Sequence, residues 1–312
     1  MTPTFEDVRT AQLRISGRVH RTPVITSSSL DHMMGAEVFY KCENLQRIGA
    51  FKFRGASNAV MSLSDEEAAK GVVTHSSGNF AQALALSARL RGIPAHVVMP
   101  EGSSLPKIEA VRDFGAETTF CAPNLAAREA TASAVQARTG ATFVHPYDDT
   151  FVIAGQGTAA LELLEECPDL DAVAAPLGGG GLLAGTALAA EGLAPGARVI
   201  GVEPSAADDA RQSLLEGHIV QARNLPTIAD GLRTSLGTLT FAVLRRTVAE
   251  VVTASEAEIA AAMKLFLSRT KLLIEPSSAV VVAALLAKRL AGRRIGVILS
   301  GGNVDLDHLP WI

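Results

Sequence analysis

The stretch DAVAAPLGGGGLLAG, residues 171–185, contains the pattern that decides the fold. A short apolar run, typical of a buried strand, leads through four glycines into an apolar segment of helical character. Strands that alternate with helices in this way build open, mostly parallel α/β sheets, and ligands bind beyond the carboxyl ends of such strands. Because one glycine would be enough for a helix cap, four in a row predict a loop whose N–H groups close on a phosphate.

The same alternation extends along the chain in both directions. Strands are predicted at residues 36–43, 71–77, 93–100, 117–123, 141–147, 171–177, 197–204 and 294–299, and helices at 78–92, 104–116, 124–140, 155–166, 258–273 and 277–292. Two sets of strands predict two lobes, each an open, mostly parallel sheet flanked by helices.

Composition limits the classes of protein to consider. The 312 residues are 48% apolar and 19% charged, with a net charge of −4 and no basic run, which excludes a disordered chain and gives no sign of a nucleic-acid or membrane-binding surface. The three cysteines are far apart, and the charged N-terminal segment lacks the apolar centre of a signal peptide. A cytoplasmic protein is expected.

Residues 47–60, RIGAFKFRGASNAV, place Lys52 between Phe51 and Phe53. One interpretation is a lysine that buries its stem and keeps its charge in water. The other is an amine desolvated so that it acts as a nucleophile or is held in a Schiff base. The peptide alone leaves both open.

Three further loops carry small polar or acidic residues. HSSGNF, residues 75–80, is either a helix cap formed by Ser76 or Ser77 or a ligand loop. LSGGN, residues 299–303, again follows a predicted strand but is a weak signal by itself. The run EPSAADD, residues 203–209, is either a solvated acidic turn or a source of oxygen ligands for a hard cation.

A nicotinamide dehydrogenase is the alternative from another class. Gly179, Gly181 and Ala184 fit the dinucleotide fingerprint, and Glu203 follows Gly179 by 24 residues (203 − 179), near the spacing of a ribose-binding acid. This interpretation leaves Lys52 and the loops at residues 75–80 and 299–303 unexplained. A lysine, a phosphate loop and polar groups for a ring together favour pyridoxal phosphate.

The chain resembles the serine/threonine dehydratase and serine racemase family of pyridoxal-phosphate enzymes, which has the tryptophan-synthase-β fold. The motifs that carry the resemblance are KCENLQRIGAFKFRGA, SSGNFAQALA, VIAGQGT, GGGGLLAG, GVEPSAADDA, IADGL, LLIEPSSA and LSGGNVD. It implies two lobes with the cofactor in the cleft between them. Residues 1–52 and 148–312 would form the large cofactor-binding domain, and residues 53–147 the small substrate-side domain.

The resemblance also implies a role for individual residues. Lys52 would form the Schiff base and act as a catalytic residue with Ser77, on the opposite face of the cofactor. Cofactor contacts are implied for Phe51, Lys52, Asn79, Gly178, Gly179, Gly180, Gly181, Leu182 and Ser300. Substrate contacts are implied for Ser76, Ser77, Phe80 and Arg128. A divalent cation such as Mg²⁺ would bind Glu203, the Ala207 carbonyl and Asp209.

The implied reaction is β-elimination from a β-hydroxy amino acid, L-threonine or L-serine first of all, to a 2-keto acid and ammonia. Serine racemisation and dehydration of 3-hydroxyaspartate are alternatives on the same scaffold, and Arg128 could pair with the second carboxylate of the latter. Ile48, Ala50 and Phe80 depart from the family pattern, and Phe80 stands where histidine is common. A small amino acid as the substrate and a homodimer as the assembly are further implications.

Overall fold

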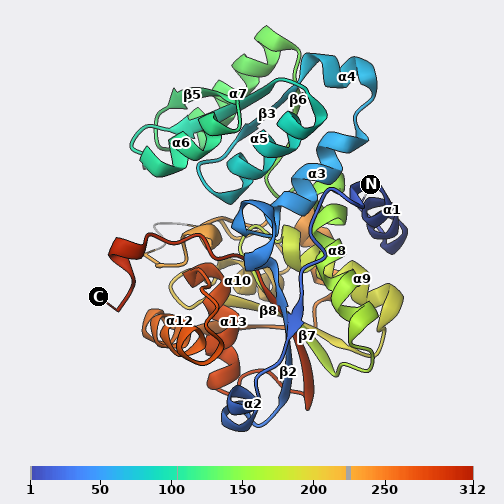
Figure 1. The fold of residues 1–312 in the computed structure, drawn as a ribbon, viewed down its shortest axis with the longest axis vertical. Coiled ribbons are helices and arrows are strands. Elements are labelled where there is room, and N and C mark those ends of the chain that lie inside the picture. The colour runs from blue at the N-terminus through green and yellow to red at the C-terminus, as the bar shows by residue number, and fades with distance from the viewer. Residues whose placement is uncertain (1, 104, 223–225, 312) are drawn as a thin grey trace.

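Two sheets form the frame of the molecule (Figure 1). The computed structural model describes residues 2–103, 105–222 and 226–311. Within these residues six strands form the larger sheet, in the spatial order β1 (Val24–Ile25), β2 (Glu37–Cys42), β10 (Arg294–Leu299), β7 (Ala172–Pro176), β8 (Arg198–Pro204) and β9 (Glu250–Ala254). The four strands described in the smaller sheet are β5 (Glu117–Cys121), β4 (Ala95–Pro100), β3 (Val72–His75) and β6 (Thr142–Phe143).

The predicted α/β class with two mostly parallel sheets is confirmed. Every neighbouring pair of the described strands is parallel except β1 with β2. All strands of the smaller sheet lie between residues 72 and 143, and those of the larger sheet lie before and after this range. The exact domain boundaries, after residues 52 and 147, stay a prediction.

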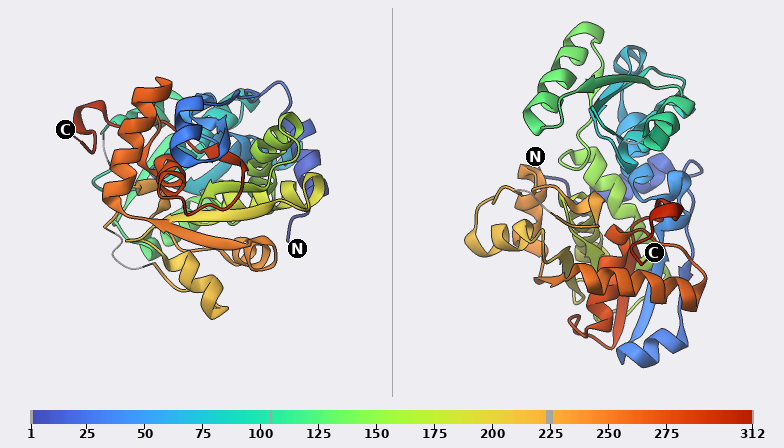
Figure 2. Two further views of the ribbon diagram at one scale, coloured as in Figure 1. Left: turned by 90° about the horizontal axis from the view of Figure 1, so that it is seen from below. Right: turned by 90° about the vertical axis from the view of Figure 1, so that its left-hand side faces the viewer.

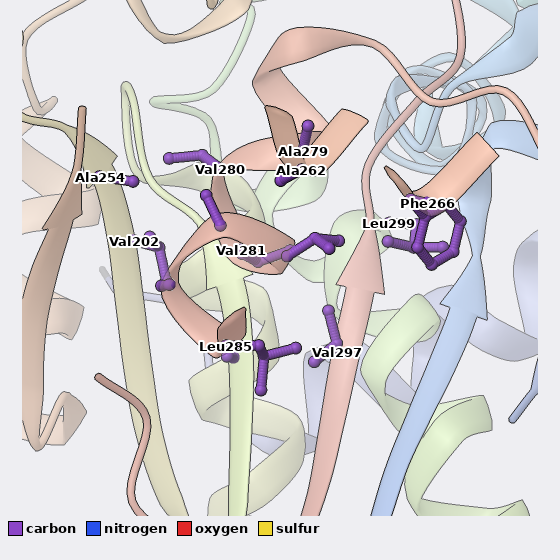
Figure 3. Packing of buried hydrophobic residues seen from close by; sticks show 14 of the residues in the cluster. Val202, Ala254, Ala262, Phe266, Ala279, Val280, Val281, Leu285, Val297 and Leu299 are labelled. Atoms are coloured by element: carbon purple, nitrogen blue, oxygen red, sulfur yellow. The ribbon is translucent and has the colours of Figure 1, made fainter. Parts of the chain in front are cut away.

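Helices cover both faces of the larger sheet (Figure 2). Strand β7 alternates between them: Ala172 and Ala174 join one core, while Val173 and Ala175 join the other. The first core lies under α2 (Ser28–Met34), α12 (Glu256–Thr270) and α13 (Pro276–Leu286), and the second under α1 (Phe5–Ile15), α8 (Thr150–Glu166), α9 (Gly181–Leu193) and α11 (Thr238–Thr247). Figure 3 shows the first core, with strand residues packed against Val281, Leu285 and Phe266. Successive side chains of a strand point to opposite faces of the sheet, so a strand that is apolar at every position, like β7, is buried on both faces.

The remaining helices are placed around the smaller sheet and at the rim of the larger one. They are α3 (Lys52–Ser62), α4 (Asp65–Lys70), α5 (Asn79–Arg91), α6 (Leu105–Asp113), α7 (Leu125–Thr139) and α10 (Asp209–Glu216). Helix α5 ends at Gly92 in the left-handed conformation, as its sequence predicts. Strand β9 and helices α10 and α11 were not predicted, because β9 is a half-buried edge strand and the two helices are short.

A buried group of charges joins α3 to the larger lobe. Arg54 on α3 is fully buried and binds the carboxylates of Glu43 and Glu162 at 2.7 and 2.8 Å. Lys41, also fully buried, binds Glu162 at 2.6 Å, so two cations face two anions. This cluster holds the first turn of the helix that begins at Lys52.

Replacement of Arg54 by methionine should lower the free energy of unfolding by about 3–5 kcal/mol, because it leaves buried carboxylates without their partner. Urea unfolding followed by circular dichroism measures this loss. The control is Arg246→Met, since Arg246 forms an exposed ion pair with Glu191 that is worth at most about 1 kcal/mol. Equal losses in the two variants would contradict the structural role assigned to Arg54.

Candidate active site

The predicted ligand loops meet where the two lobes join. Helix α3 lies at this junction (Figure 1), and Lys52 is its first residue. Asn79, at the start of α5 in the smaller lobe, hydrogen-bonds to Glu275 and Asn303 of the larger lobe. The loops after β3 and β10 are therefore brought together at the carboxyl ends of their strands, as expected for an α/β fold.

The Lys52 amine is enclosed by aromatic rings and half-buried. Its Nζ lies 5.1, 5.8 and 6.0 Å from the ring centroids of Phe51, Phe80 and Tyr147. It donates a hydrogen bond to the Pro146 carbonyl at 3.0 Å. Burial lowers the pKa of Lys52 to about 8, against a partial opposing effect of the Glu275 carboxylate. The interpretation of an amine kept from water is the one that fits this geometry.

The glycine loop forms a close-packed cradle at the start of α9, which begins at Gly181. A Cβ on Gly178 would lie 2.9 Å from the Leu232 backbone, and one on Gly179 would lie 2.5 Å from the Tyr147 ring. Gly180 has a φ of 91°, which side chains rarely adopt. Gly178, Gly179 and Gly180 are thus required by a neighbour or by backbone conformation, and the loop is no flexible linker. Leu182 behind it is buried.

The loop after β3 does not use its serines as helix caps. The N-cap of α5 is Gly78, without a side-chain hydrogen bond, so the interpretation of Ser76 or Ser77 as the capping residue is wrong. The Ser76 hydroxyl accepts the Gly78 N–H at 3.3 Å, and Ser76 and Ser77 are half-buried. Asn79 follows as the first residue of the helix and donates a hydrogen bond to Glu275 of the larger lobe.

The residues after β10 pack against the segment that precedes Lys52. Ser300 is buried, and its carbonyl accepts the N–H of Phe51 at 2.9 Å. Ala50 forms an isolated bridge with Gly301. Ile48 has a left-handed φ of 58°, so this departure from the family pattern falls on a strained turn next to the site.

Arg128 on α7 is half-buried rather than a free surface arginine. Its Nε is buried without a hydrogen-bond partner. Burial lowers the pKa of His75, and the Arg128 charge lowers it further. Burial raises the pKa of Tyr147, and the Arg128 charge opposes that rise. The Arg128 charge therefore acts on His75 at the end of β3 and on Tyr147 in the segment that follows β6.

The segment 145–149, HPYDD, was missed in the sequence, because its first three residues were assigned to the predicted strand at 141–147, whereas β6 ends at Phe143. The ring of Tyr147 packs on Gly179, and Asp148 accepts three N–H groups at the start of α11. His145 accepts the Asp148 N–H at 2.9 Å through Nδ1, and burial lowers the pKa of His145 to about 3. This histidine is neutral at physiological pH.

The expected cation site lies away from Lys52, between β8 and α10. Glu203 accepts the N–H groups of Ala210 and Arg211 at 3.2 and 2.8 Å. Both carboxylate oxygens of Asp209 are buried without a hydrogen-bond partner, and burial raises the pKa of Asp209 to about 6. Ala207 is also buried between the two. In the described ranges no three His, Cys, Asp or Glu side chains gather as a metal site, so a cation here would use two carboxylates and the Ala207 carbonyl.

The fold and the pocket have the features of an enzyme that holds a phosphorylated cofactor beside a lysine amine. The family model for pyridoxal-phosphate dependent enzymes matches residues 15–301, and the chain belongs to this family. Pyridoxal phosphate is accordingly its cofactor. The assignment replaces the dehydrogenase alternative, and Glu203 is already engaged by backbone N–H groups of α10.

Individual relatives indicate which reactions occur among similar enzymes. The chain is 51% identical to the β-hydroxyaspartate dehydratase of Paracoccus denitrificans, over 99% of both chains. It is 48% identical to a serine racemase of Arabidopsis thaliana, over 97% of this chain and 93% of the other. The solved structure of maize serine racemase superposes with a TM-score of 0.96 at 45% identity, covering 98% and 95% of the two chains. The chain thus lies among enzymes that eliminate water from hydroxy amino acids or racemise serine.

Proposed function

We propose that this protein is an ammonia-lyase that eliminates water from 3-hydroxyaspartate. The observation that carries the proposal is the Arg128 guanidinium, which is half-buried with its Nε unpaired and whose charge acts on His75 and Tyr147. A second carboxylate on the substrate would supply the missing partner. The relation to a β-hydroxyaspartate dehydratase supports the same choice. Threonine and serine, which the sequence interpretation favours, then become the poorer substrates.

The residues present fit the cofactor. The glycine cradle at the start of α9 would hold the phosphate through backbone N–H groups, because any side chain there would fill the space. Phe51, Asn79 and Ser300 would contact the ring, as the resemblance implies. Bound there, the cofactor supplies an electron-accepting ring that makes the Cα proton of the amino acid acidic.

The chain's own groups would perform the proton transfers. With its pKa lowered to about 8, Lys52 has a sizeable fraction of neutral amine that can take the Cα proton. The hydrogen bond to Pro146 fixes the position of Nζ. The β-hydroxyl leaves as water, and the released enamine tautomerises and is hydrolysed to a 2-oxo acid and ammonia. Arg128 would orient the substrate through its distal carboxylate.

A panel of substrates tests the proposal. Ammonia release is measured with 3-hydroxyaspartate, threonine and serine, and kcat/KM should be highest for 3-hydroxyaspartate. A higher kcat/KM for threonine or serine would overturn the choice of substrate. Racemisation is a second candidate, because the Ser77 hydroxyl caps no helix and is available as an acid on the other cofactor face. Chiral chromatography of the remaining substrate separates the two reactions.

A divalent cation is expected to stabilise the protein. Mg²⁺ bound by Glu203, Asp209 and the Ala207 carbonyl would give the unpaired Asp209 oxygens their partner. Saturating Mg²⁺ should therefore raise the thermal midpoint by a few degrees, on the order expected for 1–2 kcal/mol, and a chelator should reverse it. Asp209→Asn should lose the response. A rise of equal size in Asp209→Asn would contradict the site.

The assembly and the compartment stay predictions. A homodimer is proposed from the family resemblance, and sedimentation of the purified protein tests it. In the described parts of the chain, no helix combines the length and the apolar character needed to span a membrane.

A further inference from the structure

A buried carboxylate lies in the active site with no part in the chemistry described above. Glu275 precedes α13 and is only 5% exposed. Its carboxylate makes no cap hydrogen bond to that helix. It packs instead against Gly301, where an added Cβ would lie 2.8 Å from the carboxyl carbon. A charge placed so far from water needs specific partners.

The partners of Glu275 form a series of hydrogen bonds that joins the two lobes. Asn79 Nδ2 donates to both Glu275 oxygens at 3.2 Å, and the Asn303 backbone N–H donates to one of them at 3.1 Å. Asn303 Nδ2 donates to the Asn79 side-chain oxygen at 2.9 Å and to the Ile48 carbonyl at 2.7 Å. These hydrogen bonds therefore connect the turn before Lys52 to Asn79 of the smaller lobe.

The orientations of the two amides in this series of hydrogen bonds are determined by the acceptors at its ends, the Ile48 carbonyl and the Glu275 carboxylate. The Ile48 carbonyl can only accept, so the Asn303 amide must turn its NH₂ group toward it. The second N–H of that group then requires the oxygen of Asn79, which leaves the Asn79 NH₂ group facing Glu275. One N–H of Asn79 is shared between the two carboxylate oxygens. Its other N–H remains available to an acceptor in the pocket, such as an oxygen on the cofactor ring.

Glu275 is also an electrostatic neighbour of Lys52. Burial lowers the pKa of Lys52, and the Glu275 charge opposes that effect. Burial likewise raises the pKa of Glu275 to about 7. The other charges that act on Glu275 are Asp230 and Lys107, which form an ion pair with each other at 2.9 Å. Lys52 and Lys107 thus both interact electrostatically with the Glu275 carboxylate.

We propose that Glu275 is a positioning residue, whose carboxylate aligns the Asn79 amide and balances the charge on the Lys52 ammonium. The proposal deepens the proposed function and rests on it for the place of the cofactor ring. It does not depend on which amino acid is the substrate. A glutamine at this position would turn an NH₂ group against one of the N–H donors, so it removes both the charge and the alignment.

The test compares Glu275→Gln with wild type and with Glu256→Gln. Glu256, the first residue of α12, accepts the Ile228 N–H at 2.7 Å, so the control makes the same change in another hydrogen-bonded glutamate. Full-length protein freed of cofactor is reductively methylated across neutral and alkaline pH, and mass spectrometry follows the Lys52 peptide. The pH midpoint of Lys52 labelling should fall by about 1 pH unit in Glu275→Gln only. A midpoint equal to that of wild type in the folded variant overturns the proposal.

A second variant, Asn303→Ala, keeps the charge of Glu275 and removes the hydrogen bond that holds the side-chain oxygen of Asn79. Pyridoxal phosphate should bind about tenfold more weakly, since one aligned hydrogen bond is lost, while the labelling midpoint of Lys52 stays at the wild-type value. Unchanged cofactor affinity would overturn the alignment role, even if Glu275→Gln failed to fold. Neither readout involves turnover of an amino acid. A wrong substrate in the proposed function therefore leaves this test intact.

Discussion

Replacement of Lys52 by alanine is expected to lower ammonia release from 3-hydroxyaspartate by about 10³-fold or more, because the amine that takes the Cα proton is lost. The same variant should also lose the visible absorption of the lysine-bound cofactor. Both are measured on purified protein supplied with pyridoxal phosphate. The Lys52 Nζ lies 5.1–6.0 Å from the ring centroids of Phe51, Phe80 and Tyr147, so the alanine variant lacks the amine among these rings.

Two controls distinguish chemistry from folding in this experiment. Lys70→Ala removes an exposed lysine, which pairs only with Glu66 on its own helix, and should keep wild-type turnover. Addition of a small primary amine should restore part of the activity of Lys52→Ala, because it can occupy the space left by the side chain. A Lys52→Ala enzyme with wild-type turnover would exclude Lys52 from the mechanism.

Replacement of Arg128 by methionine is expected to change the choice of substrate more than any other single change. The value of kcat/KM for 3-hydroxyaspartate should fall by about 10²-fold, the cost of leaving one partner of a desolvated charge pair alone. The value for serine, which has no second carboxylate, should change by less than about threefold. Parallel kinetics with both substrates measure the two effects.

The matched control for Arg128 lies on the same helix. Arg138, also on α7, is exposed and pairs with Glu117 at 3.3 Å. Arg138→Met should leave both substrates unaffected, since surface ion pairs contribute little. If Arg128→Met lowered kcat/KM equally for 3-hydroxyaspartate and serine, the arginine would be structural and the proposed substrate would lose its main support.

Those parts of the fold that depend on local pattern could be predicted from the sequence. The alternation of strands and helices, the end of α5 at Gly92 and the glycine loop before α9 all follow from short-range rules. Lys52 could be singled out because it lies between two phenylalanines, whereas a role for Asn79 was implied only by the family resemblance. The chemistry that these loops share then led to the cofactor.

The rest of the site could not be predicted because it arises from contacts between distant segments. Asn79 meets Glu275 across 196 residues and Asn303 across 224. Glu275 lies in the motif LLIEPSSA, but nothing in the sequence indicates that it contacts Asn79, and this contact appears only in the folded structure. Tyr147 became visible in the same way, through the glycines on which its ring packs.

The alternation along β7 has a consequence for how the active site is kept in place. Its even-numbered residues fill one core and its odd-numbered residues the other, so the strand is locked in register from both sides. The glycines begin two residues after β7 ends at Pro176, so the register of β7 determines where they lie relative to the edge of the sheet. One inserted residue in β7 would exchange the two cores and carry the phosphate cradle one step further from Tyr147. The packing of the apolar side chains of β7 thus sets the position of the glycine loop.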